Sequence, residues 1–197
     1  MVDRIPVYIL AGGKSRRFGS DKALATLAGE PLLVRLARMV TPFATSVTVV
    51  ADRPGKYSSL GLRTIGDLSP GQGPLGGLIT ALDDLREPWM LLLSCDLVLV
   101  KASWIGRLMS VRRANSLAVA FRHDVWEPLC ALYSRDIRPR VQEAITAGQR
   151  SLQELLAAVP AVPMALPPDW PPIVQINTSD DLRRAEEWLK TARQPEA

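Results

Sequence analysis

The segment from Leu10 to Lys22 has the residue types and spacing to bind a polyphosphate. It reads Leu-Ala-Gly-Gly-Lys-Ser-Arg-Arg-Phe-Gly-Ser-Asp-Lys. Gly12, Gly13 and Gly19 let the backbone come close to a ligand, and successive N–H groups in such a loop form a concave anion site. Basic side chains follow at Lys14, Arg16, Arg17 and Lys22. Because arginine can hold phosphate oxygens with two hydrogen bonds and lysine acts as a movable point charge, this loop predicts a triphosphate site.

The elements around the loop would place it at a sheet edge. An apolar run from Ile5 to Leu10 predicts a buried strand before the loop, and helical spacing predicts a helix from Leu32 to Val40 after it. Open α/β sheets bind ligands at the carboxyl ends of their strands. The loop lacks both G-x-x-x-x-G-K-[ST] and G-x-G-x-x-G, so a tight turn with solvated basic residues is an alternative. Glycines, cations and the Asp21-Lys22 pair within one loop favour the nucleotide interpretation.

A second candidate group is Asp96, which follows the most apolar run of the chain, Trp89 to Ser94. This run predicts the central strand. An aspartate at the end of a buried strand suits Mg²⁺, which takes one or two carboxylates together with substrate phosphate oxygens. The alternative is an aspartate that caps the following turn. Asp67 stands at a similar place, after a short strand predicted at 62–65.

The segment Gly73-Pro74-Leu75-Gly76-Gly77 opens a helix predicted from about Leu75 to Leu85. Glycines at a helix N-terminus expose N–H groups and the positive end of the helix dipole, so this segment is a candidate second wall of the same crevice. The alternative is a close contact between helix and strand that requires small residues.

The rest of the chain alternates strands and helices, which predicts an α/β fold with a mostly parallel, Rossmann-like sheet in a three-layer α/β/α arrangement. Further strands are expected at 47–51, 117–121, 127–133 and 173–176, and further helices at 102–113, 137–147, 152–158 and from about 177 to 191. Prolines concentrated between residues 160 and 172 predict an extended loop. Thr178, with Asp181 three positions later, is a candidate cap for the last helix, and a cap is also the simplest interpretation of Asn177-Thr178.

The composition excludes several classes of protein. At 47% hydrophobic and 22% charged residues it is ordinary for a globular domain, and no apolar run approaches the ~18–20 residues that span a membrane. A net charge of +4 with scattered basic residues gives no reason to expect nucleic-acid binding. No signal peptide is apparent, and Cys95 and Cys130 lie in apolar surroundings, so we expect buried thiols in a cytoplasmic protein. The single histidine, His123, lies beside charged residues and is expected to be solvated rather than catalytic.

The loop at 10–22 resembles the L-A-G-G-x-S-x-R-M-G-x-D-K signature of the MobA-like molybdenum cofactor guanylyltransferases, with Phe18 in place of the methionine. Four weaker motifs of this family follow in the same order. They correspond to G-P-L-x-G at 73–77, C-D-x-P at 95–98, x-P-L-x-A-L-Y at 127–133 and N-x-N-T-P-x-D-L at 175–182. The chain departs from these motifs at Val98, Gln175 and Ser179, all on the side expected to face the acceptor.

The resemblance implies a sheet of the nucleotide-diphospho-sugar transferase type in a single nucleotidyltransferase domain, 1–197, with a nucleotide half at about 1–100 and an acceptor half at about 101–197. It implies transfer of GMP from GTP to molybdopterin-bound molybdenum cofactor, with release of pyrophosphate and with Mg²⁺ on Asp96. The catalytic residues it implies are Lys22, Asp96 and Arg17. Nucleotide contacts fall on Leu10, Ala11, Gly12, Gly13, Lys22, Val50, Asp67 and Asp96. Acceptor contacts fall on Gly76 and Asn177.

Three alternatives stay open: transfer of CMP to the same cofactor, a small sugar-1-phosphate nucleotidylyltransferase, and a non-catalytic nucleotide-binding protein that delivers the cofactor. Related CMP-transferring enzymes more often carry L-A-A-G, and Asn at the position of Asp21, so the sequence favours guanine. The expected partners are GTP, the molybdopterin cofactor, and molybdoenzymes or other cofactor-biosynthesis proteins. We expect a monomer or a weak homo-oligomer that binds neither nucleic acid nor membrane.

Overall fold

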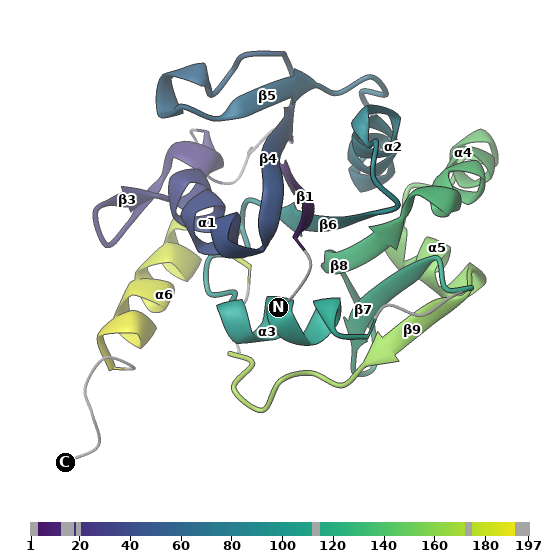
Figure 1. Cartoon of the computed structure of the whole chain (residues 1–197). Helices are drawn as coiled ribbons and strands as arrows, with labels where there is room; N and C mark the ends of the chain where they lie inside the picture. Colours follow the sequence, from purple (N-terminus) through teal and green to yellow (C-terminus); the bar gives the residue numbers. More distant parts are fainter. Residues whose placement is uncertain (1–3, 13–17, 19–20, 112–114, 172–174, 192–197) are drawn as a thin grey trace.

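The computed structural model describes residues 4–12, 18, 21–111, 115–171 and 175–191 (Figure 1). Its centre is a seven-stranded sheet with the order β5-β4-β1-β6-β8-β7-β9. Four strands form a parallel half: β5 (Arg63–Gly66), β4 (Ala44–Ala51), β1 (Ile5–Leu10) and β6 (Trp89–Ser94). The carboxyl ends of these four strands lie along one edge of the sheet, which we call the site edge. The predicted loop follows β1 there, Asp67 follows β5, and Asp96 lies just after β6. The predicted mostly parallel sheet is therefore confirmed.

The other half of the sheet changes direction. β8 (Trp126–Ser134) is antiparallel to both β6 and β7 (Ala118–Arg122), and β9 (Ala161–Met164) is parallel to β7 at the edge. The prediction of an extended loop throughout 160–172 is wrong in part, because β9 lies inside it. An edge strand tolerates Pro163, since its missing N–H leaves no central ladder bond unmade.

The strand predicted at 173–176 is not found. Residues 172–174 lie outside the described residues, and Gln175 and Ile176 are not in a strand. The backbone N–H of Ile176 donates instead to the carbonyl of Asp96, at 3.0 Å. This hydrogen bond ties Ile176 to the turn that follows β6.

Helices cover both faces of the sheet, as the three-layer prediction requires (Figure 1). Alternate residues of each strand point to opposite faces. In β1, Val7 and Ile9 join the core beneath α1 (Leu32–Val40) and α3 (Ala102–Met109). Tyr8 and Leu10 face the other core, which is covered by α2 (Pro74–Asp84), α4 (Arg138–Thr146) and α5 (Leu152–Ala158).

A third, smaller core holds the C-terminal helix α6 (Ser179–Thr191) near the site edge. It contains residues of the 97–100 turn and of a short hairpin, β2 (Thr26–Leu27) and β3 (Glu30–Pro31). The sequence analysis did not predict this hairpin. Its two turn residues, Ala28 and Gly29, have φ values of 53° and 82°, and Ala28 is not a residue that signals such a turn.

Four short 3₁₀ helices complete the described structure: η1 (Lys22–Leu24), η2 (Thr41–Phe43), η3 (Ser58–Leu60) and η4 (Arg135–Ile137). Among the described residues, none of the helices combines the length and the apolar character needed to cross a membrane.

Candidate active site

Asp96 lies in the turn that follows β6, and the fold fixes it from both sides. The preceding N–H, that of Cys95, donates to the carbonyl of Leu10 at 3.0 Å, which ties the end of β6 to the end of β1. The Asp96 carbonyl accepts from Ile176 and, also at 3.0 Å, from Val98. The residue is only 8% exposed. An aspartate is thus held rigidly, and almost out of solvent, at the edge where parallel sheets bind ligands.

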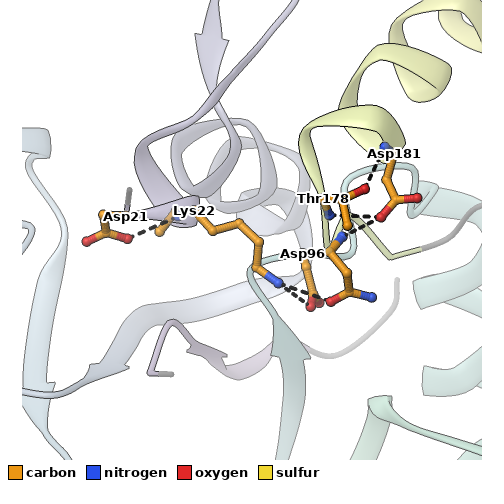
Figure 2. Close-up of polar contacts among 7 residues, drawn as sticks. Asp21, Lys22, Asp96, Thr178 and Asp181 are labelled. Atoms are coloured by element: carbon orange, nitrogen blue, oxygen red, sulfur yellow. Dashed lines mark hydrogen bonds and ion pairs between the residues drawn. The ribbon is translucent and has the colours of Figure 1, made fainter. Parts of the chain in front are cut away.

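Lys22 forms an ion pair with this aspartate. Its Nζ lies 2.8 Å from Asp96 Oδ2, and the two side chains are 16% and 12% exposed. The same Nζ donates to Oδ1 of Asn177 at 3.4 Å. Figure 2 shows the lysine side chain reaching across from its own loop to the two partners. Segments more than 70 positions apart in the sequence therefore converge on one ammonium group.

The second carboxylate oxygen of Asp96 has no hydrogen-bond partner among the described residues. Its Oδ1 is buried and accepts no hydrogen bond within the described part of the chain. An unsatisfied buried carboxylate oxygen is unfavourable, so its presence in a native fold calls for an explanation. Among the described residues there is no cluster of three His, Cys, Asp or Glu that could enclose a metal. A single carboxylate with a free oxygen fits Mg²⁺, which takes its other ligands from phosphates and water.

Asp67 occupies the end of β5, as predicted. Its N–H donates to the carbonyl of Ala51 at 2.7 Å, and its Oδ1 accepts from the N–H of Ser69 at 2.8 Å and from the hydroxyl of Thr80 at 3.2 Å. Thr80 is buried within α2 and also accepts from the N–H of Leu68. These two hydrogen bonds hold one oxygen of the Asp67 carboxylate in place. Thr80 was not singled out from the sequence, although a lone hydroxyl within the apolar stretch of α2 was a usable signal.

Comparison with known proteins identifies the family of this chain. The sequence profile of the MobA-like NTP transferase domain matches residues 7–162. This chain belongs to that family. A probable molybdenum cofactor guanylyltransferase of Synechococcus elongatus is 36% identical over 183 residues, which cover 88% of this chain and 93% of the relative.

Two further relatives support the assignment. A molybdenum cofactor guanylyltransferase of Pseudomonas putida is 34% identical over 154 residues, covering 76% of this chain and 81% of the relative. The crystal structure of molybdopterin-guanine dinucleotide biosynthesis protein A from Archaeoglobus fulgidus superposes with a TM-score of 0.80 at 27% identity. The superposition covers 94% of this chain and 99% of the chain in that structure.

The other predicted nucleotide contacts of this MobA-like chain include residues at the end of β1 and one in β4. Leu10 and Ala11 are buried, and the N–H of Ala11 donates to the carbonyl of Val50 at 2.9 Å. Val50 is itself buried in β4, so its side chain is turned into the core. A Cβ added to Gly12 would meet nothing within 4 Å, and the backbone there is open to a ligand. Gly13 and the catalytic candidate Arg17 lie outside the described residues.

The glycines that open α2 are packed inside the MobA-like fold. A Cβ on Gly76 would lie 2.5 Å from the carbonyl oxygen of Ser69, and one on Gly77 would lie 2.9 Å from the side chain of Leu10. The structure therefore gives both glycines the packing role that was the alternative interpretation. Acceptor binding through Gly76 stays a prediction.

Asn177 belongs to a helix cap and to the site at once. The N–H groups of Asn177 and Thr178 both donate to Oδ2 of Asp181 at 2.9 Å, and the N–H of Asp181 donates back to the hydroxyl of Thr178 at 3.1 Å (Figure 2). The hydrogen bond from the Asn177 backbone, followed by that from the Thr178 hydroxyl, lowers the pKa of Asp181. The predicted cap is confirmed. It fixes the backbone of Asn177 and leaves its side-chain amide free to reach Lys22.

Other reactive side chains lie away from this edge or are inert. Cys95 and Cys130 are buried free thiols, as expected, and burial raises the pKa of Cys95 to about 12. His123 is exposed in the β7–β8 connection and pairs with the exposed Asp124. The described structure therefore offers no reason to assign these groups a catalytic role.

Proposed function

We propose that this chain is a molybdenum cofactor guanylyltransferase, which transfers GMP from GTP to the terminal phosphate of molybdopterin-bound cofactor and releases pyrophosphate. The observation that carries the proposal is the Lys22–Asp96–Asn177 group at the carboxyl ends of the parallel strands of a MobA-like sheet. Within the described part of the chain, one carboxylate oxygen of Asp96 in this group has no partner. The names of the relatives add the nucleotide and the acceptor.

Catalysis of this reaction depends mainly on positioning the two substrates and on stabilising the charge that develops in the transition state. An acceptor phosphate oxygen attacks the α-phosphorus in line, the bond to the bridging oxygen breaks, and pyrophosphate leaves. The attacking phosphate is already ionised, so no general base is required, which is consistent with the exposed position of His123. Negative charge grows on the oxygens around phosphorus, and a fixed cation there lowers the barrier.

Lys22 is the described side chain best placed for that task. In the free protein its ammonium is shared between Asp96 and Asn177, and it has three N–H donors. We expect it to turn one donor toward the α-phosphate when the nucleotide binds. Arg17 and the backbone at Gly12 and Gly13 are the predicted ligands of the β- and γ-phosphates.

Asp96 is the proposed Mg²⁺ ligand, through its free Oδ1. When bound, Mg²⁺ would neutralise phosphate charge and stabilise the leaving pyrophosphate. Asp67, with Oδ1 held by Thr80 and Ser69, is proposed to accept hydrogen bonds from the guanine base or the ribose through Oδ2.

A product assay tests this function. The protein is incubated with Mg²⁺, molybdopterin-type acceptor and one of GTP, CTP, ATP or UTP, and pyrophosphate release and dinucleotide formation are measured. We expect turnover with GTP and a loss of turnover in Lys22→Ala. Lys101→Ala is a matched control, because Lys101 also pairs with an aspartate, Asp169, at 2.6 Å, but has no assigned role in the reaction.

Each alternative gives a distinct result in the same assay. Preference for CTP would identify a cytidylyltransferase, and turnover only with a sugar 1-phosphate would identify a sugar nucleotidylyltransferase. Binding of GTP without turnover under any condition would indicate a delivery protein and contradict the proposal.

A further inference from the structure

Asp21, the residue before Lys22, is anchored by side chains that were assigned no role from the sequence. The hydroxyl of Tyr57 lies 3.1 Å from Oδ1 and 3.0 Å from Oδ2 of Asp21. Lys56 Nζ lies 3.1 Å from Oδ2, and the N–H of Ala23 donates to Oδ1 at 3.1 Å. Asp21 therefore interacts with three donors, and its capping bond starts η1, whose first residue is Lys22.

Tyr57 is a rigid support for this contact. Its side chain is 1% exposed and belongs to the core beneath α1 and α3, so the position of its hydroxyl is set by packing. Burial, together with the negative charge of Asp21, raises the pKa of Tyr57 well above its ordinary value. The hydroxyl thus remains protonated and can donate throughout the physiological range.

Lys56 adds a charge to the same contact. Its Nζ bridges Asp21 and Asp52, which lies 2.8 Å away, and the lysine side chain is 21% exposed. Burial opposes its charge, but the hydrogen bonds to Asp52 and Asp21 outweigh this effect and raise the pKa of Lys56. The segment after β4 therefore binds Asp21, at the start of η1, through one neutral donor, Tyr57, and one cation, Lys56.

We propose that Tyr57, supported by Lys56, is a positioning residue that holds Asp21 and thereby sets the reach of Lys22 toward the reacting phosphate. This inference rests on the proposed function. Lys22 follows a glycine-rich stretch of sequence, and its ammonium is attracted by Asp96. Fixing the backbone one residue earlier limits the positions that the ammonium can take. Misplacement by about 1 Å can slow a reaction about 100-fold.

The chain contains a matched network for comparison. Tyr8 is also buried, and its hydroxyl also donates to an aspartate, Asp84, at 2.8 Å, which in turn pairs with a cation, Arg63. This second network joins β1, β5 and α2 and includes no predicted site residue. Tyr8→Phe therefore removes the same kind of hydrogen bond as Tyr57→Phe without touching Lys22.

Steady-state kinetics of the two variants test the inference. For Tyr57→Phe we expect kcat to fall by about tenfold or more while the KM for GTP changes by less than about threefold, because the misplaced charge matters most in the transition state. For Tyr8→Phe we expect a similar change in melting temperature and an unchanged kcat. In a Lys22→Ala background, Tyr57→Phe should cause no further loss, since its effect passes through the lysine. A wild-type kcat in Tyr57→Phe, or losses that multiply in the double variant, would overturn the inference.

Amide hydrogen exchange tests the anchor without substrate. We expect the Ala23 N–H to exchange faster in Tyr57→Phe than in wild type, and to be unchanged in Tyr8→Phe; equal exchange in all three proteins would contradict the anchor. A wild-type protein that lacks turnover would contradict the proposed function, and this exchange result would still decide whether the anchor exists.

Discussion

Two aspartate–cation pairs of this protein have similar distances but differ in whether both carboxylate oxygens have partners. At the site edge, Lys22 lies 2.8 Å from Asp96. In the network that includes Tyr8, Arg63 lies 2.7 Å from Asp84. Both oxygens of Asp84 are bound, by the guanidinium and by the Tyr8 hydroxyl. Asp96 binds through one oxygen only, and its Oδ1 is buried without a partner among the described residues.

This difference is the one that we expect between a pair that stabilises the fold and a pair that binds a ligand. A satisfied network stabilises the native state, and its hydrogen bonds can be counted within the chain. An unsatisfied buried oxygen costs stability that a bound cation would recover. The position of each pair agrees with this division, because Asp96 ends a parallel strand whereas Asp84 ends a helix on the covered face.

The largest expected effect is on catalysis at the unsatisfied pair. Asp96→Asn keeps the shape of the side chain and an oxygen for Lys22, but it removes the charge proposed to hold Mg²⁺. We expect kcat to fall by about 100-fold or more, with a melting temperature near that of wild type. Asp84→Asn is the control and should leave kcat unchanged. Pyrophosphate release and thermal unfolding of both variants provide the measurement, and a fully active Asp96→Asn variant would contradict the division.

The intermediate effect is on stability at the satisfied pair. Asp84→Ala leaves the buried hydroxyl of Tyr8 and the guanidinium of Arg63 without their acceptor, so we expect a loss of about 1–3 kcal/mol in the free energy of unfolding. Tyr8→Phe combined with Asp84→Ala should recover part of that loss. Urea unfolding at pH 7 measures both, and an unchanged free energy for Asp84→Ala would show that the network does not stabilise the fold.

The acid dependence of the same pair has a defined sign. The hydrogen bonds from Arg63 lower the pKa of Asp84 below its ordinary value, despite partial burial. Its contribution to stability is therefore complete above that ordinary value and is lost as the pH falls through the lower folded value. We expect wild type to lose more stability than Asp84→Asn between pH 5 and pH 2. Parallel acid-unfolding curves for the two proteins would contradict this expectation.

The smallest expected effect is on stability and concerns the carboxyl group of Glu127. Glu127, half-buried in β8, has its pKa raised by burial alone. Its folded pKa lies above the unfolded one, so the carboxyl favours the folded state most below the ordinary pKa and loses this contribution as the pH rises. Glu127→Gln should therefore raise the melting temperature slightly at pH 7 and have no stabilising effect at pH 4. A lower melting temperature at pH 7 would reveal a favourable partner for the charge.

The sequence predicted the parallel half of the sheet better than the half that contains β8, β7 and β9. Apolar runs indicate β1, β6 and the second half of β4, and because Cys95 and Asp96 directly follow β6, Asp96 could be placed at a strand end from the sequence alone. The antiparallel direction of β8 and the strand β9 could not be predicted. Pro163 argues against a strand, and only the position of β9 at the edge of the sheet permits one. Lys22 was predicted because the loop at 10–22 closely resembles the signature of a known family.

Contacts between distant segments explain what the sequence did not show. The buried hydroxyls of Tyr57 and Thr80 contact aspartates 36 and 13 positions away, and no local spacing signals such a pair. Gly76 looked like a ligand-facing residue, yet its missing Cβ makes room for a backbone carbonyl. Only the folded chain shows which small or polar residue faces a neighbour and which faces an open site.

Calorimetric binding of GTP to wild type, Asp96→Asn and Asp84→Asn, each with and without Mg²⁺, tests the central claim most directly. The account predicts that Mg²⁺ strengthens GTP binding by wild type and Asp84→Asn, and that this gain falls at least about tenfold in Asp96→Asn. An equal gain from Mg²⁺ in all three proteins would contradict it, because the free oxygen of Asp96 would then have no part in holding the metal–nucleotide complex.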